Sequence, residues 1–404
     1  FVMYTSSLYR ADVSEYLMRT RFSDVVTTNS AVFLRNKTDV ILPTNKTNKL
    51  TIKTEESLTK KSDVIMILLW SKCMGHACMP AGIYGDADFK CEVTEDRSKI
   101  KEAQAVMFHT CILSNVAEVG LPTYRSANQK WIFRCAEAPA KGAKSTRKIP
   151  LKFLELQDAL KDAFNFTMTT RLDSDYHTYH GLYSVNPDPP KVLPDYAQGK
   201  SKPVAWIASH HCESQSRREL YVQRLREHIE VDAYGGCGWL TCPDPTNRAV
   251  CQRHVGATYK FYLAFENSDC RDYVTEKVWK NSFLMNTVPI VRGYYSNFKS
   301  ILPPGSYIHT NEFPNPKALA KYLKYLDKNH TAYNEYLMNN EYKWRLTYKI
   351  DSTSSKRNWG NGLCRKLHET KGQTKTYKNI WKEFYSFDNN CYNYYDIPLN
   401  KFDK

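Results

Sequence analysis

Short, continuous apolar runs recur along the chain from residue 63 onward and alternate with amphipathic segments. The first run, DVIMILLW at 63–70, is bounded by polar residues, which is typical of a strand buried on both faces of a parallel sheet. Similar runs follow at 103–113, 129–139 and 164–175, and the amphipathic segment 150–164 predicts a helix. Strands that alternate with helices predict an α/β domain.

A second series of the same kind begins after a proline-rich stretch, residues 186–203, which is the best candidate for a domain boundary. The apolar runs of this series predict strands at 204–209, 231–236, 259–267, 287–293 and 306–313, and amphipathic segments predict helices at 217–229, from Tyr273 and at 316–329. Two α/β series predict two Rossmann-like domains that face each other across a cleft.

These patterns divide the chain into four parts. Residues 1–62 are rich in Thr, Asn, Ser and Lys and predict a poorly ordered stem. Residues 63–198 and 199–350 predict the N-terminal and C-terminal Rossmann-like domains. Residues 351–404 are polar and rich in Lys and Tyr, and they are assigned only as a C-terminal extension.

The formal net charge of +15 calls for an anionic partner or surface. Nucleic acid, acidic lipid headgroups, acidic glycans and a nucleotide diphosphate all meet this requirement. The sequence contains no helix-turn-helix, zinc-finger or RNA-recognition pattern, which disfavours a nucleic-acid partner. The surplus is also concentrated late in the chain, with seventeen Lys and Arg but nine Asp and Glu from Lys317 onward.

The twelve cysteines favour disulfides and an oxidising compartment. Cys73, His76 and Cys78 could instead contribute to a metal site, but this set is cramped and incomplete, so no metal site is predicted. Four sequons point to the lumen of the secretory pathway, at Asn36, Asn45, Asn165 and Asn329. The chain has no apolar run of eighteen residues and begins at Phe1, and we expect a signal or anchor to precede it.

One stretch, YKFYLAFENSDCRDYVTEKVWKNSF at 259–283, places a polar bend between a buried strand and an amphipathic helix. A helix that begins near Asp272 would align polar side chains on one face, namely Tyr273, Glu276, Lys277 and Lys280. Helix N-termini suit phosphate oxygens, Lys277 adds a cation, and Glu276 offers an acceptor to ribose hydroxyls. The alternative is an ordinary surface helix that Asp272 caps.

The segment FYLAFENSDCRDYVTEKVWKN, with TVPIVRG after it, resembles the signature of the α-1,3-fucosyltransferases of glycosyltransferase family 10. The resemblance extends over roughly residues 65–345 and includes QKWIFRCAEAP and WIASHHCESQSRRELYVQRL. It implies an α/β fold of the GT-B type, with the donor in the C-terminal domain and the acceptor in the N-terminal one. It also implies an inverting α-1,3 transfer of L-fucose from GDP-β-L-fucose to GlcNAc.

The resemblance also implies roles for individual residues. Asn267, Tyr273 and Glu276 would hold the ribose and neighbouring donor groups. Lys277 and Arg218 would stabilise charge on the diphosphate. Glu137 would be the catalytic base, and His109 is a possible acceptor-side residue.

The implied partners are GDP-fucose, as co-substrate, and a glycoprotein glycan. No cofactor is required, although a divalent cation such as Mn²⁺ can stimulate the family reaction. The acceptor stays open between the N-glycan core, an N-acetyllactosamine antenna and a protein hydroxyl.

The resemblance implies a Golgi lumenal enzyme, held in the membrane by a type II signal-anchor. The alternatives are a catalytically silent lumenal protein that binds glycan or nucleotide on the same fold, and a protein O-fucosyltransferase. Near the C-terminus the sequence keeps only Cys364 of a cysteine pair common in the family, so no disulfide pairing is implied.

Overall fold

The structure, a computed structural model, describes residues 64–73, 77–111, 120–139, 158–189, 191–192, 194–210, 212–293, 295–338, 344–348, 353–373 and 375–392. The predicted stem, the sequons at Asn36 and Asn45, and most of the helix predicted at 150–164 lie outside these residues.

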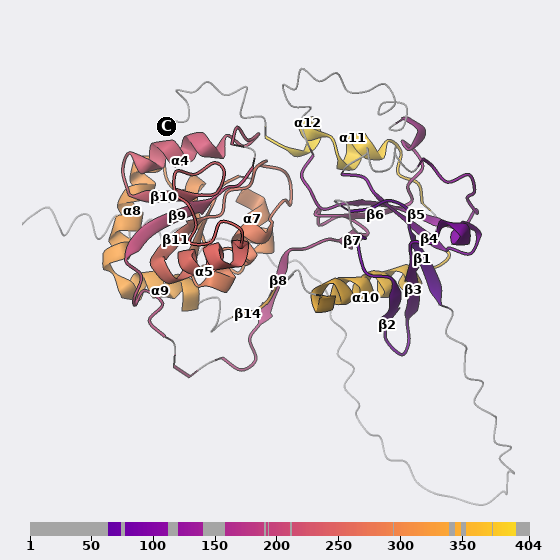
Figure 1. Ribbon diagram of the computed structural model, residues 1–404, viewed down its shortest axis with the longest axis horizontal. Coiled ribbons are helices and arrows are strands. Elements are labelled where there is room, and N and C mark those ends of the chain that lie inside the picture. Colours follow the sequence, from indigo (N-terminus) through magenta and orange to yellow (C-terminus); the bar gives the residue numbers. More distant parts are fainter. Residues whose placement is uncertain are drawn as a thin grey trace, which may run out of the picture. The chain divides into compact units, whose positions relative to one another are not determined.

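The first sheet contains the apolar runs of the N-terminal series (Figure 1). Its seven strands lie in the order β2-β3-β1-β4-β5-β6-β7, and all neighbours are parallel except β2 and β3. Their bounds are β1 Ile65–Leu69, β2 Gly82–Gly85, β3 Lys90–Thr94, β4 Ala105–His109, β5 Lys130–Cys135, β6 Phe166–Thr169 and β7 Tyr176–His177. A short 3-10 helix, η1 Arg97–Lys101, connects β3 to β4. The strands predicted at 63–70, 103–113, 129–139 and 164–175 are confirmed.

Residues from the C-terminal part of the chain cover both faces of this sheet. Along β1, Ile67 contributes to one hydrophobic cluster and Leu68 to the other, as the alternation of side chains along a strand requires. Helix α10 (Thr353–Glu369) contributes Leu363 to the first cluster, and α11 (Ile380–Phe384) contributes Trp381 to the second. Part of the segment that the sequence left without a fold therefore completes the core of the first sheet.

The second sheet is fully parallel and has five strands in the order β10-β9-β11-β12-β13. Their bounds are β9 Lys202–Ile207, β10 Val231–Tyr234, β11 Tyr259–Leu263, β12 Val288–Val291 and β13 Ile308–His309. The helices of this part are α4 Arg218–Arg226, α5 Arg248–Thr258, α6 Glu276–Trp279, α7 Tyr295–Ile301, α8 Pro316–Lys328 and α9 His330–Met338, with 3-10 turns η2 Phe283–Met285 and η3 Thr310–Glu312. One mostly parallel and one fully parallel sheet, each packed with helices, confirm the α/β class and the two Rossmann-like sheets of the GT-B type.

A small antiparallel pair lies where the chain leaves the first sheet and where it returns from the second. Strand β8 (Gly181–Val185) precedes β9, and β14 (Trp344–Tyr348) follows α9. The two strands pair from Gly181 with Tyr348 to Val185 with Trp344. Of residues 186–203, predicted as a boundary, the described positions up to Ser201 contain turns and no helix or strand, whereas Lys202 and Pro203 already belong to β9.

All twelve cysteines form disulfides: Cys73–Cys78, Cys91–Cys364, Cys111–Cys135, Cys212–Cys237, Cys242–Cys251 and Cys270–Cys391. The predicted preference for disulfides is thus confirmed, and Cys73 and Cys78 bond to each other instead of to a metal. Among the described residues, no helix combines the length and apolar character that crossing a membrane requires.

We expect the disulfide between Cys91 on β3 and Cys364 on α10 to stabilise the fold strongly, because it closes a loop of 273 residues. The double variant Cys91→Ser/Cys364→Ser should lower the free energy of unfolding by about 2–4 kcal/mol in denaturant titrations. The variant Cys242→Ser/Cys251→Ser is the matched control, since its bond spans a separation of nine. A larger loss in the control would refute this ranking.

Candidate active site

Strands β9 and β11 are neighbours in the second sheet, and the chain connections that leave their carboxyl ends run to opposite sides of the sheet. From β9 the chain continues to β10 on one side, and from β11 to β12 on the other. Ligands of open α/β sheets bind in the crevice at such a point. The loops that follow β9 and β11 are joined there, because Ser216 N donates to the Asn267 carbonyl at 3.1 Å.

Arg218 lies near this point of the sheet as the first residue of α4 and is only 4% exposed. Its Nη1 donates to the Phe265 carbonyl at 3.0 Å, and its Nη2 donates to the His210 carbonyl at 3.2 Å. Its buried Nε has no hydrogen-bond partner among the described residues. Burial lowers the pKa of the guanidinium, while the nearby Glu266 carboxylate opposes that change. A buried cation with a spare donor is suited to an anionic ligand.

Glu266 follows β11 and is the central carboxylate of the crevice, with 1% of its surface exposed. It accepts hydrogen bonds from Thr275 N at 2.8 Å and from Thr275 Oγ1, and it pairs with Lys277 Nζ at 2.8 Å. Sequence reasoning gave Glu266 no role. Its position directly after a buried strand was the signal that could have found it.

The bend after β11 is longer than the sequence predicts, and the expected helix start at Asp272 is wrong. Asp272 has a φ of 58°, in the left-handed region, so it is not a residue of a right-handed helix, and the N-cap of α6 is Thr275. The Asp272 carboxylate accepts from Leu172 N at 3.0 Å instead of capping. Helix α6 begins at Glu276, so the predicted polar stripe is also wrong, because Tyr273 precedes the helix.

Glu276 and Lys277 are adjacent on α6 and act on each other electrostatically. Burial would raise the pKa of the Glu276 carboxyl, but Lys277, His180 and Arg248 together hold it well below its usual range. Burial would likewise lower the pKa of Lys277, but Glu266 and Glu276 hold it above its usual range. Both groups are therefore charged at neutral pH.

Asn267, in the bend between β11 and α6, has a buried side-chain oxygen, Oδ1, without a hydrogen-bond partner among the described residues. Buried acceptors without a partner cost free energy, so this atom is suited to accept from a ligand hydroxyl or amine. The structure thus places Arg218 at the start of α4, Asn267 in the bend after β11, and Glu276 and Lys277 at the start of α6, all beyond the carboxyl ends of β9 and β11.

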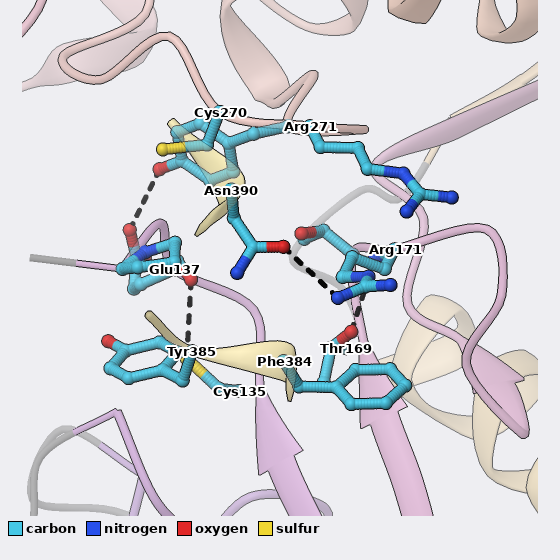
Figure 2. A pocket seen from close by; sticks show the side chains of 12 residues that line it. Cys135, Glu137, Thr169, Arg171, Cys270, Arg271, Phe384, Tyr385 and Asn390 are labelled. Atoms are coloured by element: carbon cyan, nitrogen blue, oxygen red, sulfur yellow. Dashed lines mark hydrogen bonds between the residues drawn. The ribbon is translucent and has the colours of Figure 1, made fainter. Parts of the chain in front are cut away.

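Glu137 lies beyond the end of β5, and its carboxylate accepts a hydrogen bond from Tyr273 Oη at 3.0 Å (Figure 2). Desolvation raises the pKa of Glu137, while Tyr273 and Lys277 act to lower it and Glu276 and Glu266 to raise it further. Tyr273 is 3% exposed, and burial and the Glu137 carboxylate raise the pKa of its phenol well above the ordinary value. Tyr273 therefore stays protonated as the donor to Glu137.

A small pocket surrounds Glu137, and three further segments of the chain line it. They contribute, in chain order, Thr169, Thr170 and Arg171 at the end of β6 and just beyond it; Cys270, Arg271 and Tyr273 before α6; and Phe384, Tyr385 and Asn390 near the C-terminus. Sequence reasoning missed the C-terminal contribution, since those residues lie far from any recognised motif. Arg171, which lies in the run 164–175 that predicted a strand, also lines the pocket.

His109 lies elsewhere, at the end of β4, where it pairs in register with Arg134 of β5. It is 3% exposed, and its backbone N donates to Ser71 Oγ at 2.8 Å. It is not among the residues that line the pocket around Glu137. An acceptor-side role for His109 remains a prediction.

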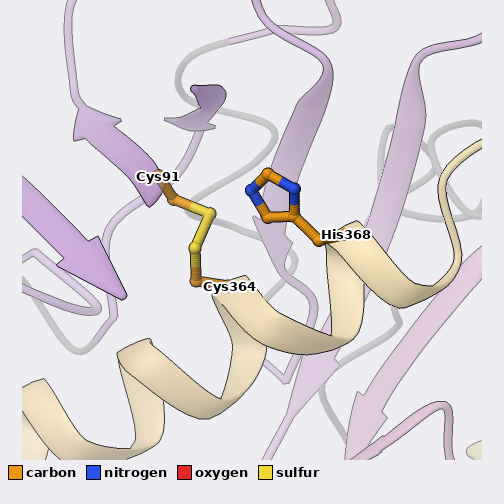
Figure 3. A group of neighbouring side chains, drawn as sticks. All are labelled: Cys91, Cys364 and His368. Carbon is orange, nitrogen blue, oxygen red and sulfur yellow. A yellow bond between two sulfur atoms is a disulfide. The ribbon is translucent and has the colours of Figure 1, made fainter. Parts of the chain in front are cut away.

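Cys91, Cys364 and His368 form a cluster in which three metal-ligand atoms approach one another (Figure 3). Both sulfurs belong to one disulfide, and thiolates are the metal-binding form of cysteine. His368 Nε2 instead lies 2.9 Å from the Lys90 carbonyl. The cluster therefore lacks the ligands of a metal site.

Two of the four sequons lie in the described residues. Asn165 is half-buried, and its side chain accepts from Trp131 N at 2.6 Å and donates to the Gln129 carbonyl at 3.3 Å. Asn329 follows α8, and its Nδ2 donates to Tyr325 Oη at 3.0 Å. Glycosylation at both positions remains a prediction.

Comparison with known proteins identifies the family. The model described as "Fucosyltransferase, N-terminal" matches residues 62–181, and "Glycosyltransferase family 10 (fucosyltransferase) C-term" matches residues 197–383. The chain is 34% identical over 322 residues to a 3-galactosyl-N-acetylglucosaminide 4-alpha-L-fucosyltransferase of Pongo pygmaeus, covering 77% of each chain. The protein belongs to glycosyltransferase family 10.

Other members of the fucosyltransferase family are similarly related. A human 4-galactosyl-N-acetylglucosaminide 3-alpha-L-fucosyltransferase is 36% identical over 283 residues, which are 70% of this chain and 68% of that protein. A mouse alpha-(1,3)-fucosyltransferase is 35% identical over 263 residues, 63% of this chain and 55% of that protein. A solved alpha1,3-fucosyltransferase structure with GDP aligns with 78% of this chain and 94% of its own, at 16% identity and a TM-score of 0.45, and nothing about substrate follows from that likeness.

Proposed function

We propose that this family 10 enzyme moves L-fucose from GDP-β-L-fucose, with inversion, to O-3 of a GlcNAc in a glycoprotein glycan. The acceptor is the N-glycan core or an N-acetyllactosamine antenna. One observation carries the proposal: the buried cation Arg218, with an unpartnered Nε, lies in the same crevice as the Lys277–Glu266 ion pair. Family membership supports the donor, because the relatives are named as fucosyltransferases.

Two groups of residues, Glu137 in its pocket and the side chains beyond β9 and β11, divide the reaction between them. The Glu137 carboxylate accepts the proton of the acceptor hydroxyl as that oxygen attacks C1 of fucose from the face opposite GDP. The bond between C1 and the diphosphate oxygen breaks, and its electron pair leaves with GDP. Arg218 and Lys277 stabilise the negative charge that develops there, while Asn267 and Glu276 bind the nucleoside part. No step requires a cofactor, and whether Mn²⁺ stimulates the enzyme is a separate question for the same assay.

Six disulfides in the described chain support a location in an oxidising lumen, which we propose to be the Golgi.

The direct test of function is incubation with GDP-fucose and a panel of core N-glycopeptides, N-acetyllactosamine oligosaccharides and Ser/Thr peptides. GDP release and the mass of each acceptor are read together. We expect one added deoxyhexose on a GlcNAc-containing glycan. Addition to peptide hydroxyls would favour a protein O-fucosyltransferase, and GDP binding without transfer to any acceptor would favour a silent binding protein.

We expect the hydrogen bond from Tyr273 to shift the pH dependence of transfer. Glu137 must be ionised to accept a proton, and Tyr273 stabilises that ionised form. Tyr273→Phe should therefore raise the pKa of Glu137 and move the acidic limb of the kcat profile to higher pH. Tyr325→Phe, which changes an exposed tyrosine on α8, is the control. An acidic limb that stays in place in Tyr273→Phe would show that the bond does not act on the base.

We expect that the protein does not bind nucleic acid specifically, despite its net charge of +15. The enzyme should elute from immobilised DNA and RNA at physiological salt with no preference for sequence, because exposed basic residues alone give salt-sensitive retention. Sequence-specific retention under those conditions would contradict this expectation.

A further inference from the structure

We infer that the C-terminal arm, defined here as residues 380–391, forms a wall of the acceptor site, with Tyr385 as the residue that contacts the acceptor sugar. The inference rests on the proposed function and extends it to a segment that no sequence motif marks. Three kinds of observation support it: the place of the arm, the support behind the Tyr385 ring, and the covalent bond that holds the arm.

The arm lies against the segments that line the Glu137 pocket. Asn390 accepts a hydrogen bond from Arg171 Nη1 at 3.0 Å, and the Asn390 carbonyl accepts from Arg271 N at 2.7 Å. Arg171 also lies over the Phe384 ring, 4.3 Å from its centroid. These contacts join the arm to the loop after β6 and to the loop before α6.

Tyr385 lies beside Glu137 in this pocket (Figure 2). Tyr385 is half-buried, and its ring packs against two buried aromatics, Phe133 at 6.1 Å and Trp381 at 6.3 Å between centroids. Its hydroxyl donates to the Ala138 carbonyl at 3.3 Å. An aromatic ring that is already held in place loses little conformational entropy when a ligand packs on it. A rigid, partly open ring beside a catalytic carboxylate suits the apolar face of a sugar.

The charge beside Tyr385 favours a neutral acceptor at this wall. Burial and the Glu137 carboxylate raise the pKa of the Tyr385 phenol, so the hydroxyl stays protonated. A neutral hydroxyl near a carboxylate offers hydrogen bonds to sugar hydroxyls without adding charge. This chemistry fits GlcNAc better than an acidic sugar.

The Cys270–Cys391 disulfide fixes the end of the arm to the bend that carries Tyr273. Two backbone hydrogen bonds accompany it, from Arg271 N to the Asn390 carbonyl and from Tyr392 N to the Asp269 carbonyl at 2.9 Å. The same bend therefore touches the proposed donor crevice at one end and the proposed acceptor wall at the other.

The test compares Michaelis constants in the full chain, with the panel glycan that the parent fucosylates best as acceptor. We expect Tyr385→Ala to raise the acceptor KM about tenfold, through loss of the ring contact, while the KM for GDP-fucose changes little. Tyr385→Phe, which keeps the ring, should produce a much smaller rise. Tyr392→Ala, which removes an exposed ring one residue beyond the arm, is the matched control.

Two further measurements keep the outcomes distinct. Cys270→Ser/Cys391→Ser should also raise the acceptor KM, whereas Cys242→Ser/Cys251→Ser should not. Binding of core N-glycopeptide in the presence of GDP, followed by calorimetry, reports on the arm even if no transfer occurs. A parent that binds glycan but transfers no fucose would contradict the proposed function alone. Unchanged acceptor KM and unchanged glycan binding in folded Tyr385→Ala would overturn the inference about the arm.

Discussion

Glu137→Gln should lower fucose transfer by a factor of about 10²–10⁴, which is the usual contribution of a positioned general base. Glutamine keeps the size of the side chain and can still accept the hydrogen bond from Tyr273 Oη. It cannot accept the acceptor proton. GDP binding should persist, because the groups proposed to hold the diphosphate, Arg218 and Lys277, lie on α4 and α6.

Glu95→Gln is the matched control for this variant, because Glu95 is exposed and follows β3 at the carboxyl edge of the same sheet. Transfer and GDP affinity should be measured on one folded preparation of each protein. A structural carboxylate would lower stability and GDP binding together with activity. Transfer by Glu137→Gln within a few-fold of the parent would show that Glu137 is not the base.

Arg218→Ala and Lys277→Ala should each weaken GDP binding by about 10- to 150-fold. The reason is the loss of a charge-assisted hydrogen bond to phosphate, which contributes roughly 1.5–3 kcal/mol. The stabilising shift that GDP gives to the thermal midpoint should shrink in both variants. Removal of Lys277 also leaves the buried Glu266 carboxylate without the ammonium that lies 2.8 Å from it, which can destabilise the fold. The stability of each ligand-free variant should therefore be measured together with its calorimetric affinity for GDP.

Lys280→Ala is the control for the loss of a positive charge, because Lys280 follows α6 and has no proposed contact with the diphosphate. Its affinity for GDP should stay close to that of the parent. If both Arg218→Ala and Lys277→Ala bound GDP like the parent, the crevice between β9 and β11 would not be the donor site.

The central strands could be predicted because their apolar runs are long enough to mark burial on both faces. Strand β4 is buried at every position, and the sequence shows it as an uninterrupted run. Strand β2 lies at the edge and β3 next to it, and both carry exposed residues, such as Lys90 on β3, so no such run marks them. Helix α5 was missed for a similar reason, since its eleven residues mix apolar, polar and basic side chains without a clear stripe.

The site could be predicted only where one motif carries it. Arg218 begins α4, Asn267 lies in the bend after β11, and Glu276 and Lys277 begin α6, although the helix start was placed four residues too early. Their roles in donor binding stay predictions. A left-handed residue such as Asp272 cannot be recognised from its neighbours alone. Nor can sequence reveal that Cys391 bonds to Cys270 across 121 residues, or that Tyr385 therefore lies beside Glu137. Those facts depend on tertiary contacts.

The most direct measurement of the central claim is the NMR spectrum of the product formed by the parent enzyme from GDP-β-L-fucose and its best glycan acceptor. The anomeric coupling and the linkage shifts identify both the configuration and the oxygen that carries fucose. The proposed mechanism predicts an α-fucoside on O-3 of GlcNAc, in an amount that falls with Glu137→Gln. A β-fucoside, or free fucose and GDP with no glycan product, would contradict it.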